Sequence, residues 1–259
     1  MAVGLQELYQ ILKPSFSFAG AGRLYQDAVG RWAMRILGLM FAHHTTSEVS
    51  PESFVAQGEV LAKELTQFLT VFLDEPAAQN LTDQFFAQLP TIQQSLKHDA
   101  EAMEEGDPAA TNIDEVIWCY PGFLALGLYR QAHYFQQQGQ RTFARLISEY
   151  GHQKTGIDIH PGAVIGEYCC IDHGTGVVIG ETAILGHHVK LYQGVTIGAL
   201  SVKKEDAHQK RHPTIEDYCV IYAHATILGG ETTIGHHAVI GGNVWLTHSV
   251  LPHAKVQCF

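Results

Sequence analysis

The chain has 259 residues, a formal net charge of −10 and 46% hydrophobic residues, which allows one large or two modest domains with a real core. The acidic charge argues against binding to nucleic acid or to an anionic membrane surface. The N-terminus lacks the basic flank and apolar stretch of a signal peptide, and the apolar residues 32–42 are too few to span a bilayer. The five cysteines show no metal-ligand spacing. We therefore expect a cytoplasmic protein in a reducing compartment.

Residues 1–150 carry apolar side chains at intervals of three and four, which is the spacing of amphipathic helices. Ser50 is placed to cap a helix that begins at Pro51, and Tyr120-Pro121-Gly122 begins another. We expect a helical domain over residues 1–150 and a second domain over residues 151–259, divided near Gly151 where the helical pattern stops. The pattern predicts helices over residues 6–12, 24–43, 51–73, 81–99 and 123–150.

From residue 159 to residue 246 an apolar residue, often followed by glycine, returns about every six positions. A period of six suits a β-solenoid, in which each hexad forms one short strand and one corner. Each of these index residues should point into the coil, and glycine should follow where the corner needs tight backbone geometry. The alternative is a sandwich of short strands. The index residues are Ile159, Ile165, Ile171, Ile179, Leu185, Leu191, Ile197, Ile215, Ile221, Ile227, Ile234, Ile240 and Leu246.

Two interruptions break this period. The eight-residue step between Ile171 and Ile179 contains residues 172–176, which should push backbone and side chains out of register beside a strand. Between Ile197 and Ile215 the chain forms a polar loop that is rich in Lys and Arg. Such a loop is either a solvated excursion or part of a site for an anionic ligand.

Three motifs follow one another along the repeats: Asp158-Ile159-His160-Pro161, then DHGTGVVIGETA over residues 172–183, then Arg211-His212-Pro213. With these motifs, residues 107–252 resemble the serine O-acetyltransferase family of the hexapeptide-repeat acyltransferase superfamily, although Gly174 replaces an alanine of the second motif. The resemblance implies an α+β fold, with an all-helical N-terminal domain followed by a C-terminal left-handed parallel β-helix. It also implies transfer of an acetyl group from acetyl-CoA to the hydroxyl of L-serine, giving O-acetyl-L-serine and CoA, the first step of cysteine biosynthesis from serine.

A serine hydroxyl is a poor nucleophile at neutral pH, so the reaction needs a base within hydrogen-bond reach. His173 is the candidate, because a neutral imidazole takes the hydroxyl proton and afterwards protonates the leaving thiolate. Asp158 lies 15 residues earlier, close to one coil turn of three hexads. From the neighbouring turn it would fix the tautomer of His173, as the aspartate of a catalytic triad does.

The resemblance also assigns the substrate contacts. Arg211 would pair with the serine carboxylate in a forked geometry, and His212 would lie beside it. Asp172 and Asp107 would receive the ammonium group, although Asp107 has the alternative role of a helix cap.

Acetyl-CoA would lie in the groove between neighbouring coils of a trimer, where small residues let the pantetheine approach the backbone. One of three lysines, Lys203, Lys204 or Lys210, would meet its phosphates. The small residues at the matching positions are Gly198, Ala199, Ala223, Gly241 and Gly242.

The family also suggests partners. We expect a homotrimer or a dimer of trimers, and L-cysteine as a feedback inhibitor. In the family, a tail that ends in Ile enters the active site of O-acetylserine sulfhydrylase, whereas this sequence ends at Phe259. We expect no required metal, no nucleic acid and no membrane partner.

Three other readings of the sequence stay open. An acyltransferase of the same class that acts on a sugar or antibiotic hydroxyl would also carry a histidine base, but it gives no reason for the charged set that fits an amino acid. A γ-class carbonic anhydrase would bind Zn²⁺ through three histidines, for which His212, His248 and His253 are candidates, yet these sit at unequal positions relative to their index residues. A non-catalytic scaffold would leave Asp158 and His173 unexplained.

Overall fold

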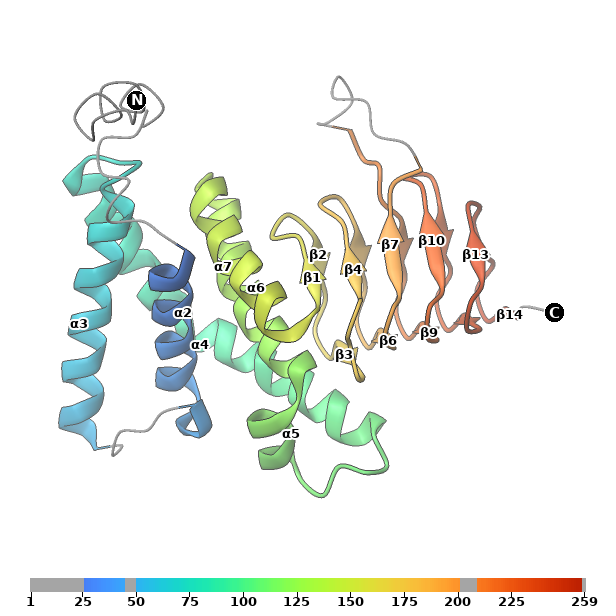
Figure 1. Ribbon diagram of the computed structural model, residues 1–259, viewed down its shortest axis with the longest axis horizontal. Coiled ribbons are helices and arrows are strands. Elements are labelled where there is room, and N and C mark those ends of the chain that lie inside the picture. Colours follow the sequence, from blue (N-terminus) through green and yellow to red (C-terminus); the bar gives the residue numbers. More distant parts are fainter. Residues whose placement is uncertain (1–25, 45–49, 201–208, 258–259) are drawn as a thin grey trace, which may run out of the picture.

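The computed structural model describes residues 26–44, 50–200 and 209–257, which form a group of helices followed by a coil of short strands (Figure 1). The expected helix over residues 6–12 lies outside these ranges. Within them, no helix is both long enough and apolar enough to cross a membrane. The helical elements are α2 (Gln26–Met40), η2 (Ala42–His44), α3 (Pro51–Leu69), α4 (Glu75–Gly106), α5 (Ile113–Cys119), α6 (Pro121–Gln137) and α7 (Arg141–Thr155).

The start of α3 confirms its predicted cap: the side chain of Ser50 accepts a hydrogen bond from the Ser53 N–H at 3.1 Å. Helix α4 is longer at both ends than expected, with Asp74 as its N-cap. The single helix expected over residues 123–150 is wrong. The chain instead breaks into α6 and α7 at Gly139, whose φ of +77° is left-handed and cannot continue an α-helix. Helix α5, capped by Asn112, was not expected at all.

Aromatic rings fill the centre of the helical part. The indole of Trp32 lies within 6.1 Å, between ring centroids, of Phe85, Phe135 and Phe143, and its Nε1–H donates to the Leu61 carbonyl at 3.0 Å. These contacts join α2, α3, α4, α6 and α7 around one buried side chain.

The strands form three parallel sheets, in the orders β1-β4-β7-β10-β13, β2-β5-β8-β11 and β3-β6-β9-β12-β14, so that each turn of the coil adds one strand to each sheet. This topology excludes the sandwich alternative. All thirteen index residues lie in strands, and each is no more than 7% exposed, which confirms the predicted period. The strands are β1 (Asp158–Ile159), β2 (Val164–Ile165), β3 (Cys170–Ile171), β4 (Val178–Ile179), β5 (Ile184–Leu185), β6 (Lys190–Leu191), β7 (Thr196–Gly198), β8 (Thr214–Ile215), β9 (Val220–Ile221), β10 (Thr226–Leu228), β11 (Thr233–Ile234), β12 (Val239–Ile240), β13 (Trp245–Leu246) and β14 (Lys255–Val256).

The corners of the coil differ from expectation in one respect. The glycines directly after the index residues do not have a positive φ. Most residues with a left-handed conformation are instead His, Tyr or Asn, three positions after the index residue, for example Tyr168 and His188. Those glycines are needed for close approach, since a Cβ on Gly166 would lie 2.6 Å from the Gly186 carbonyl oxygen of the next turn.

A buried ion pair fastens the helices to the first turn of the coil. Asp99 of α4 and Arg130 of α6 are joined by two hydrogen bonds of 2.7 and 2.8 Å. Asp99 also accepts from the Cys169 N–H at 2.9 Å, and Arg130 donates to the Gly166 carbonyl at 2.9 Å.

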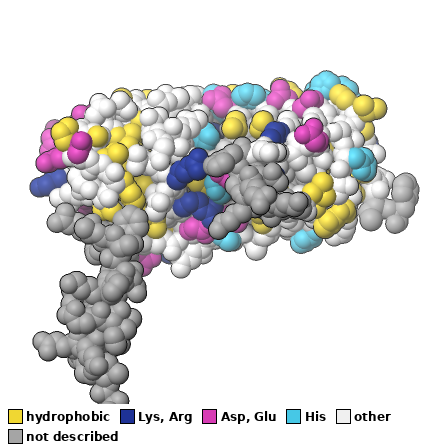
Figure 2. Space-filling model, turned by 90° about the horizontal axis from the view of Figure 1, so that it is seen from above, with side chains coloured by type: hydrophobic (Ala, Val, Ile, Leu, Met, Phe, Trp, Pro, Cys, Tyr) yellow, Lys and Arg dark blue, Asp and Glu magenta, His cyan; other side chains and the backbone are white. Residues whose placement is uncertain are grey.

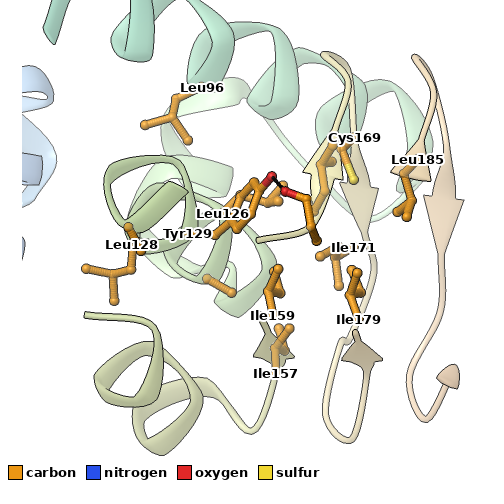
Figure 3. Close-up of a cluster of buried hydrophobic side chains, with 14 of the residues drawn as sticks. Leu96, Leu126, Leu128, Tyr129, Ile157, Ile159, Cys169, Ile171, Ile179 and Leu185 are labelled. Atoms are coloured by element: carbon orange, nitrogen blue, oxygen red, sulfur yellow. Dashed lines mark hydrogen bonds between the residues drawn. The ribbon is translucent and has the colours of Figure 1, made fainter. Parts of the chain in front are cut away.

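Apolar side chains from the helices and from the coil also pack together in one cluster (Figure 3). The hydroxyl of Tyr129 donates to the Ala163 carbonyl at 2.6 Å within the cluster. Helix α7 continues through Gly151 to Thr155, and β1 begins at Asp158. The division into two domains at residue 150 stays a prediction.

Candidate active site

The eight-residue step of the sequence forms a corner after β3, and His173 stands on it. Three of its residues have positive φ: His173 at 59°, Gly174 at 78° and Gly176 at 81°. A Cβ on Gly174 would lie 2.4 Å from the Ile157 side chain, so a residue larger than glycine does not fit at position 174 unless its neighbours move. The backbone turns outward here, and the His173 side chain is 69% exposed.

Two predicted carboxylates lie at this corner with His173. Nδ1 of His173 is 3.7 Å from Oδ1 of Asp172. Asp107, the residue directly after α4, accepts hydrogen bonds from the Tyr120 hydroxyl at 2.5 Å and from the Ala109 N–H at 2.8 Å. These two bonds, together with the charges of Lys190 and His173, hold the pKa of the Asp107 carboxyl below its ordinary value. The cap alternative also applies, because Asp107 is the C-cap of α4.

Sequence reasoning missed two residues of this corner. The hydrogen bond to Asp107 raises the pKa of Tyr120, so its hydroxyl stays a donor. Lys190 of β6 lies 3.5 Å from Oδ2 of Asp172 and donates to the Gly106 carbonyl at 2.6 Å. Neither residue belongs to one of the three motifs. Lys190 reaches α4 only because the helix packs against the coil in the folded chain.

Asp158 begins β1 and is half-buried. Its register partner in the next turn is Val178, because the eight-residue step lengthens this turn to 20 residues. The argument from 15-residue spacing therefore does not hold at this turn. In the structure the carboxylate that lies beside the His173 ring is that of Asp172, and the pairing of Asp158 with His173 stays a prediction.

Arg211 lies at a different corner, just before β8. Its guanidinium forms an ion pair with Glu181, and its backbone N–H donates to the Thr182 hydroxyl at 2.9 Å. Burial alone would raise the pKa of Glu181, but the hydrogen bond from Arg211 and the charge of His160 lower it. Glu181 and Thr182 belong to the second motif, so the sequence marked them as candidate site residues although their contact with Arg211 was not predicted.

His212 packs against the same corner and is 8% exposed. Burial, and then the charge of Arg211, lower its pKa to about 4, so the ring is neutral near pH 7. Nδ1 accepts from the Thr182 N–H at 3.1 Å, which places the proton of the neutral ring on Nε2. A Cβ on Gly180 would lie 2.0 Å from this ring, so the ring fits only against glycine.

The small residues expected to contact CoA divide between the same two corners. Ala223, Gly241 and Gly242 follow β9 and β12, at the corner type that carries His173, and the Asn243 N–H donates to the Ala223 carbonyl at 3.0 Å. Gly198 ends β7 and Ala199 follows it, at the corner type that carries Arg211.

Both corners border the sheet β1-β4-β7-β10-β13. The His173 corner lies along the edge formed by the starts of its strands, and the Arg211 corner lies along the edge formed by their ends. Viewed from above, several Lys and Arg side chains lie near the middle of the molecule's face, whereas acidic and His side chains are spread along it (Figure 2). Of the candidate phosphate contacts, Lys203 and Lys204 lie outside the described residues. Lys210 donates to the backbone carbonyls of Thr182 and His212 at 3.1 and 2.8 Å, which ties it to the Arg211 corner.

The three histidines weighed as zinc ligands do not converge. His212 packs on Gly180, whereas the ring of His253 stacks on His237 at another corner, with 5.0 Å between centroids. In the part of the chain that the structure describes, no three His, Cys, Asp or Glu side chains are grouped to hold a metal ion.

A helical region followed by a parallel coil of hexads, with charged groups at two of its corners, defines the class of hexapeptide-repeat acyltransferases. Residues 47–127 match the family model described as "Serine acetyltransferase, N-terminal". The chain is 51% identical over 178 residues to a plasmid-encoded serine acetyltransferase of Synechococcus elongatus, a match that covers 67% of this chain and 56% of that relative. It is 46% identical over 162 residues to a serine acetyltransferase of Mycobacterium tuberculosis, covering 62% of this chain and 69% of the relative.

Solved structures agree with these matches. Serine acetyltransferase 1 from Entamoeba histolytica in complex with L-cysteine has a TM-score of 0.81 at 35% identity, over 90% of this chain and 86% of that one. Serine acetyltransferase from Neisseria gonorrhoeae in complex with serine has a TM-score of 0.62 at 27% identity, over 86% of this chain and 93% of that one. The chain therefore belongs to the serine acetyltransferase family. The predicted resemblance and fold class, a helical region followed by a left-handed parallel β-helix, are confirmed.

Proposed function

We propose that the chain transfers the acetyl group of acetyl-CoA to the hydroxyl of L-serine and releases O-acetyl-L-serine and CoA, the first step of cysteine biosynthesis from serine. Family membership supports this reaction. The observation that carries it is the corner at which Asp107, Asp172 and His173 lie together. Two carboxylates beside one imidazole complement a molecule whose ammonium group is next to a hydroxyl group.

In the proposed mechanism, the imidazole of His173 takes the hydroxyl proton while the hydroxyl oxygen attacks the thioester carbon. The tetrahedral intermediate then collapses, the carbon–sulfur bond breaks, and the imidazolium returns the proton to the CoA thiolate. Asp158 is proposed to orient the ring during these steps. The His173 side chain is 69% exposed, and the proposal requires its ring to turn from Asp172 toward Asp158.

The carboxylate of serine is proposed to bind at the Arg211 corner. A guanidinium pairs with a carboxylate through two parallel hydrogen bonds, and Arg211 already holds a carboxylate in the form of Glu181. The Nε2–H of the neutral His212 ring supplies a further donor for the substrate beside it.

Acceptor and donor are proposed to meet between two copies of the chain. In one copy, His173 and Arg211 lie at corners on opposite edges of one sheet. In a closed ring of identical coils, one edge of each copy faces the other edge of its neighbour, which brings the two groups together. The small residues at both edges then line the groove for acetyl-CoA, in a homotrimer or a dimer of trimers.

L-Cysteine differs from serine by a thiol in place of the hydroxyl, so we propose that it occupies the acceptor site as a feedback inhibitor. The Entamoeba histolytica relative was solved with L-cysteine bound.

Binding to O-acetylserine sulfhydrylase and a cytoplasmic location stay predictions. The cysteines of the described residues carry free thiols, which supports a reducing compartment.

The test is CoA thiol release from acetyl-CoA with L-serine, homoserine, threonine and acceptor sugars in parallel. We expect L-serine to give the largest kcat/KM, with O-acetyl-L-serine as the product. Faster release with a sugar, and none with serine, would replace this proposal with the sugar acetyltransferase alternative.

A further inference from the structure

Lys190 contacts both Asp172 and the end of α4 at the His173 corner, and no motif accounts for it. It lies in β6, beside Cys170 of β3, and its side chain is 17% exposed. Its Nζ donates to the Gly106 carbonyl at 2.6 Å, lies 3.5 Å from Asp172 Oδ2, and is 4.7 Å from the centre of the Tyr192 ring.

These contacts link the coil to the end of α4. Gly106 is the last residue of α4 and is followed directly by Asp107, so the bond from Lys190 restrains the backbone that carries Asp107. The same ammonium reaches Asp172 on the coil. One cation therefore touches both elements that supply carboxylates to the corner.

The charges of the corner also depend on this lysine. Two nearby carboxylates repel each other, and a cation beside them offsets part of this repulsion. Lys190 is one of the charges that lower the pKa of Asp107. Burial lowers the pKa of Lys190 itself, but Tyr192, Cys170 and Asp172 outweigh it and raise the value, so the side chain stays charged.

We propose that Lys190 is a positioning residue of the acceptor site, which holds Asp107 and Asp172 in place to receive the substrate ammonium group. This role rests on the proposed function. With Lys190, the two carboxylates carry one net negative charge, the complement of a single ammonium. The titratable groups that face this corner from all packed elements are Glu105, Asp107, Tyr120, Tyr168, Cys170, Asp172, His173, His188 and Tyr192.

The test compares the kcat and the KM for serine of Lys190→Met with those of the wild type. Without the lysine, the end of α4 loses its bond to the coil and Asp172 loses its cation, so the substrate ammonium group is held less well. The KM for serine should therefore rise about tenfold, while kcat and the KM for acetyl-CoA stay unchanged. Lys190→Arg keeps the charge and should restore most of the wild-type KM for serine.

Lys255→Met is the matched control, since Lys255 lies in the same sheet at its exposed last strand, and its KM for serine should stay at the wild-type value. An unchanged KM for serine in Lys190→Met, or KM values for serine and acetyl-CoA that rise together, would assign the lysine a merely structural role and overturn the proposal. Thermal unfolding of each variant shows whether it folds. If Lys190→Met does not fold, Lys190→Arg carries the test, and a rise of about tenfold in its KM for serine overturns the proposal. A wild-type chain that releases no CoA with serine overturns the proposed function, and this role with it.

Discussion

His173 is set apart from the other left-handed residues of the coil by its place in the chain. It comes two positions after its index residue, whereas His188 and His237 come three positions after theirs. Those two rings belong to a stack along another edge of the coil, in which Tyr218 lies between them at 4.5 and 4.7 Å between centroids. His173 instead leaves its ring open to solvent beside Asp172, where a substrate can reach it.

Replacing His173 with alanine should lower turnover by about 10²–10⁴-fold, because the hydroxyl loses its base. Binding of acetyl-CoA should be retained. Steady-state kinetics with serine and an acetyl-CoA titration measure the two quantities. His237→Ala removes a histidine from an equally left-handed position, at φ 58°, and should keep turnover. Equal activity of the two variants would show that His173 is not the base.

Gly180→Ala should displace the His212 ring, because the new methyl group would lie 2.0 Å from it. We expect the KM for serine to rise about tenfold, because the Arg211 corner then loses the hydrogen-bond donor that His212 supplies to the substrate carboxylate. Gly58→Ala is the control, since nothing lies within 4 Å of a Cβ there, and it should leave kinetics unchanged. An unchanged KM for serine in Gly180→Ala would remove His212 from the acceptor site.

At the scale of elements, the strands of the coil could be predicted from the sequence, but the ends of the helices and their contacts with the coil could not. Each strand repeats one pattern, so thirteen index residues placed thirteen strands correctly. The break between α6 and α7 rests on the left-handed conformation of Gly139, which glycine permits but does not require. Of the site, the motifs predicted where His173 and Arg211 lie, but contacts such as Lys190 with Gly106 depend on how α4 docks against the coil.

The docking of helices on the coil depends on the buried pair of Asp99 and Arg130. Asp99 is fully buried, whereas Arg35 forms an exposed pair with Glu64. Arg130→Met leaves an uncompensated buried carboxylate and should cost about 3–5 kcal/mol of the free energy of unfolding. Arg35→Met should cost at most about 1 kcal/mol. Urea unfolding at equal protein concentration measures both, and equal losses would mean that the buried pair does not fasten the two parts.

At the scale of the whole molecule, the coil separates the groups that the proposed reaction uses. The carboxylates and His173 lie along one edge of the sheet β1-β4-β7-β10-β13, and Arg211 and His212 lie along the other. Trp245 on the face between these edges is 67% exposed, and Val178 is 36% exposed. Apolar side chains on that face favour its contact with another copy.

The central claim is that these two edges act together as one site between copies, and mixing two inactive variants tests it directly. His173→Ala and Arg211→Ala are each expected to be nearly inactive at low serine. If each site takes His173 from one copy and Arg211 from the next, then co-expressed variants that mix at random restore about a quarter of the sites. Thiol release with serine should therefore recover to about a quarter of the wild-type rate. A mixture no more active than its separate variants, in trimers shown to contain both chains, would contradict the account.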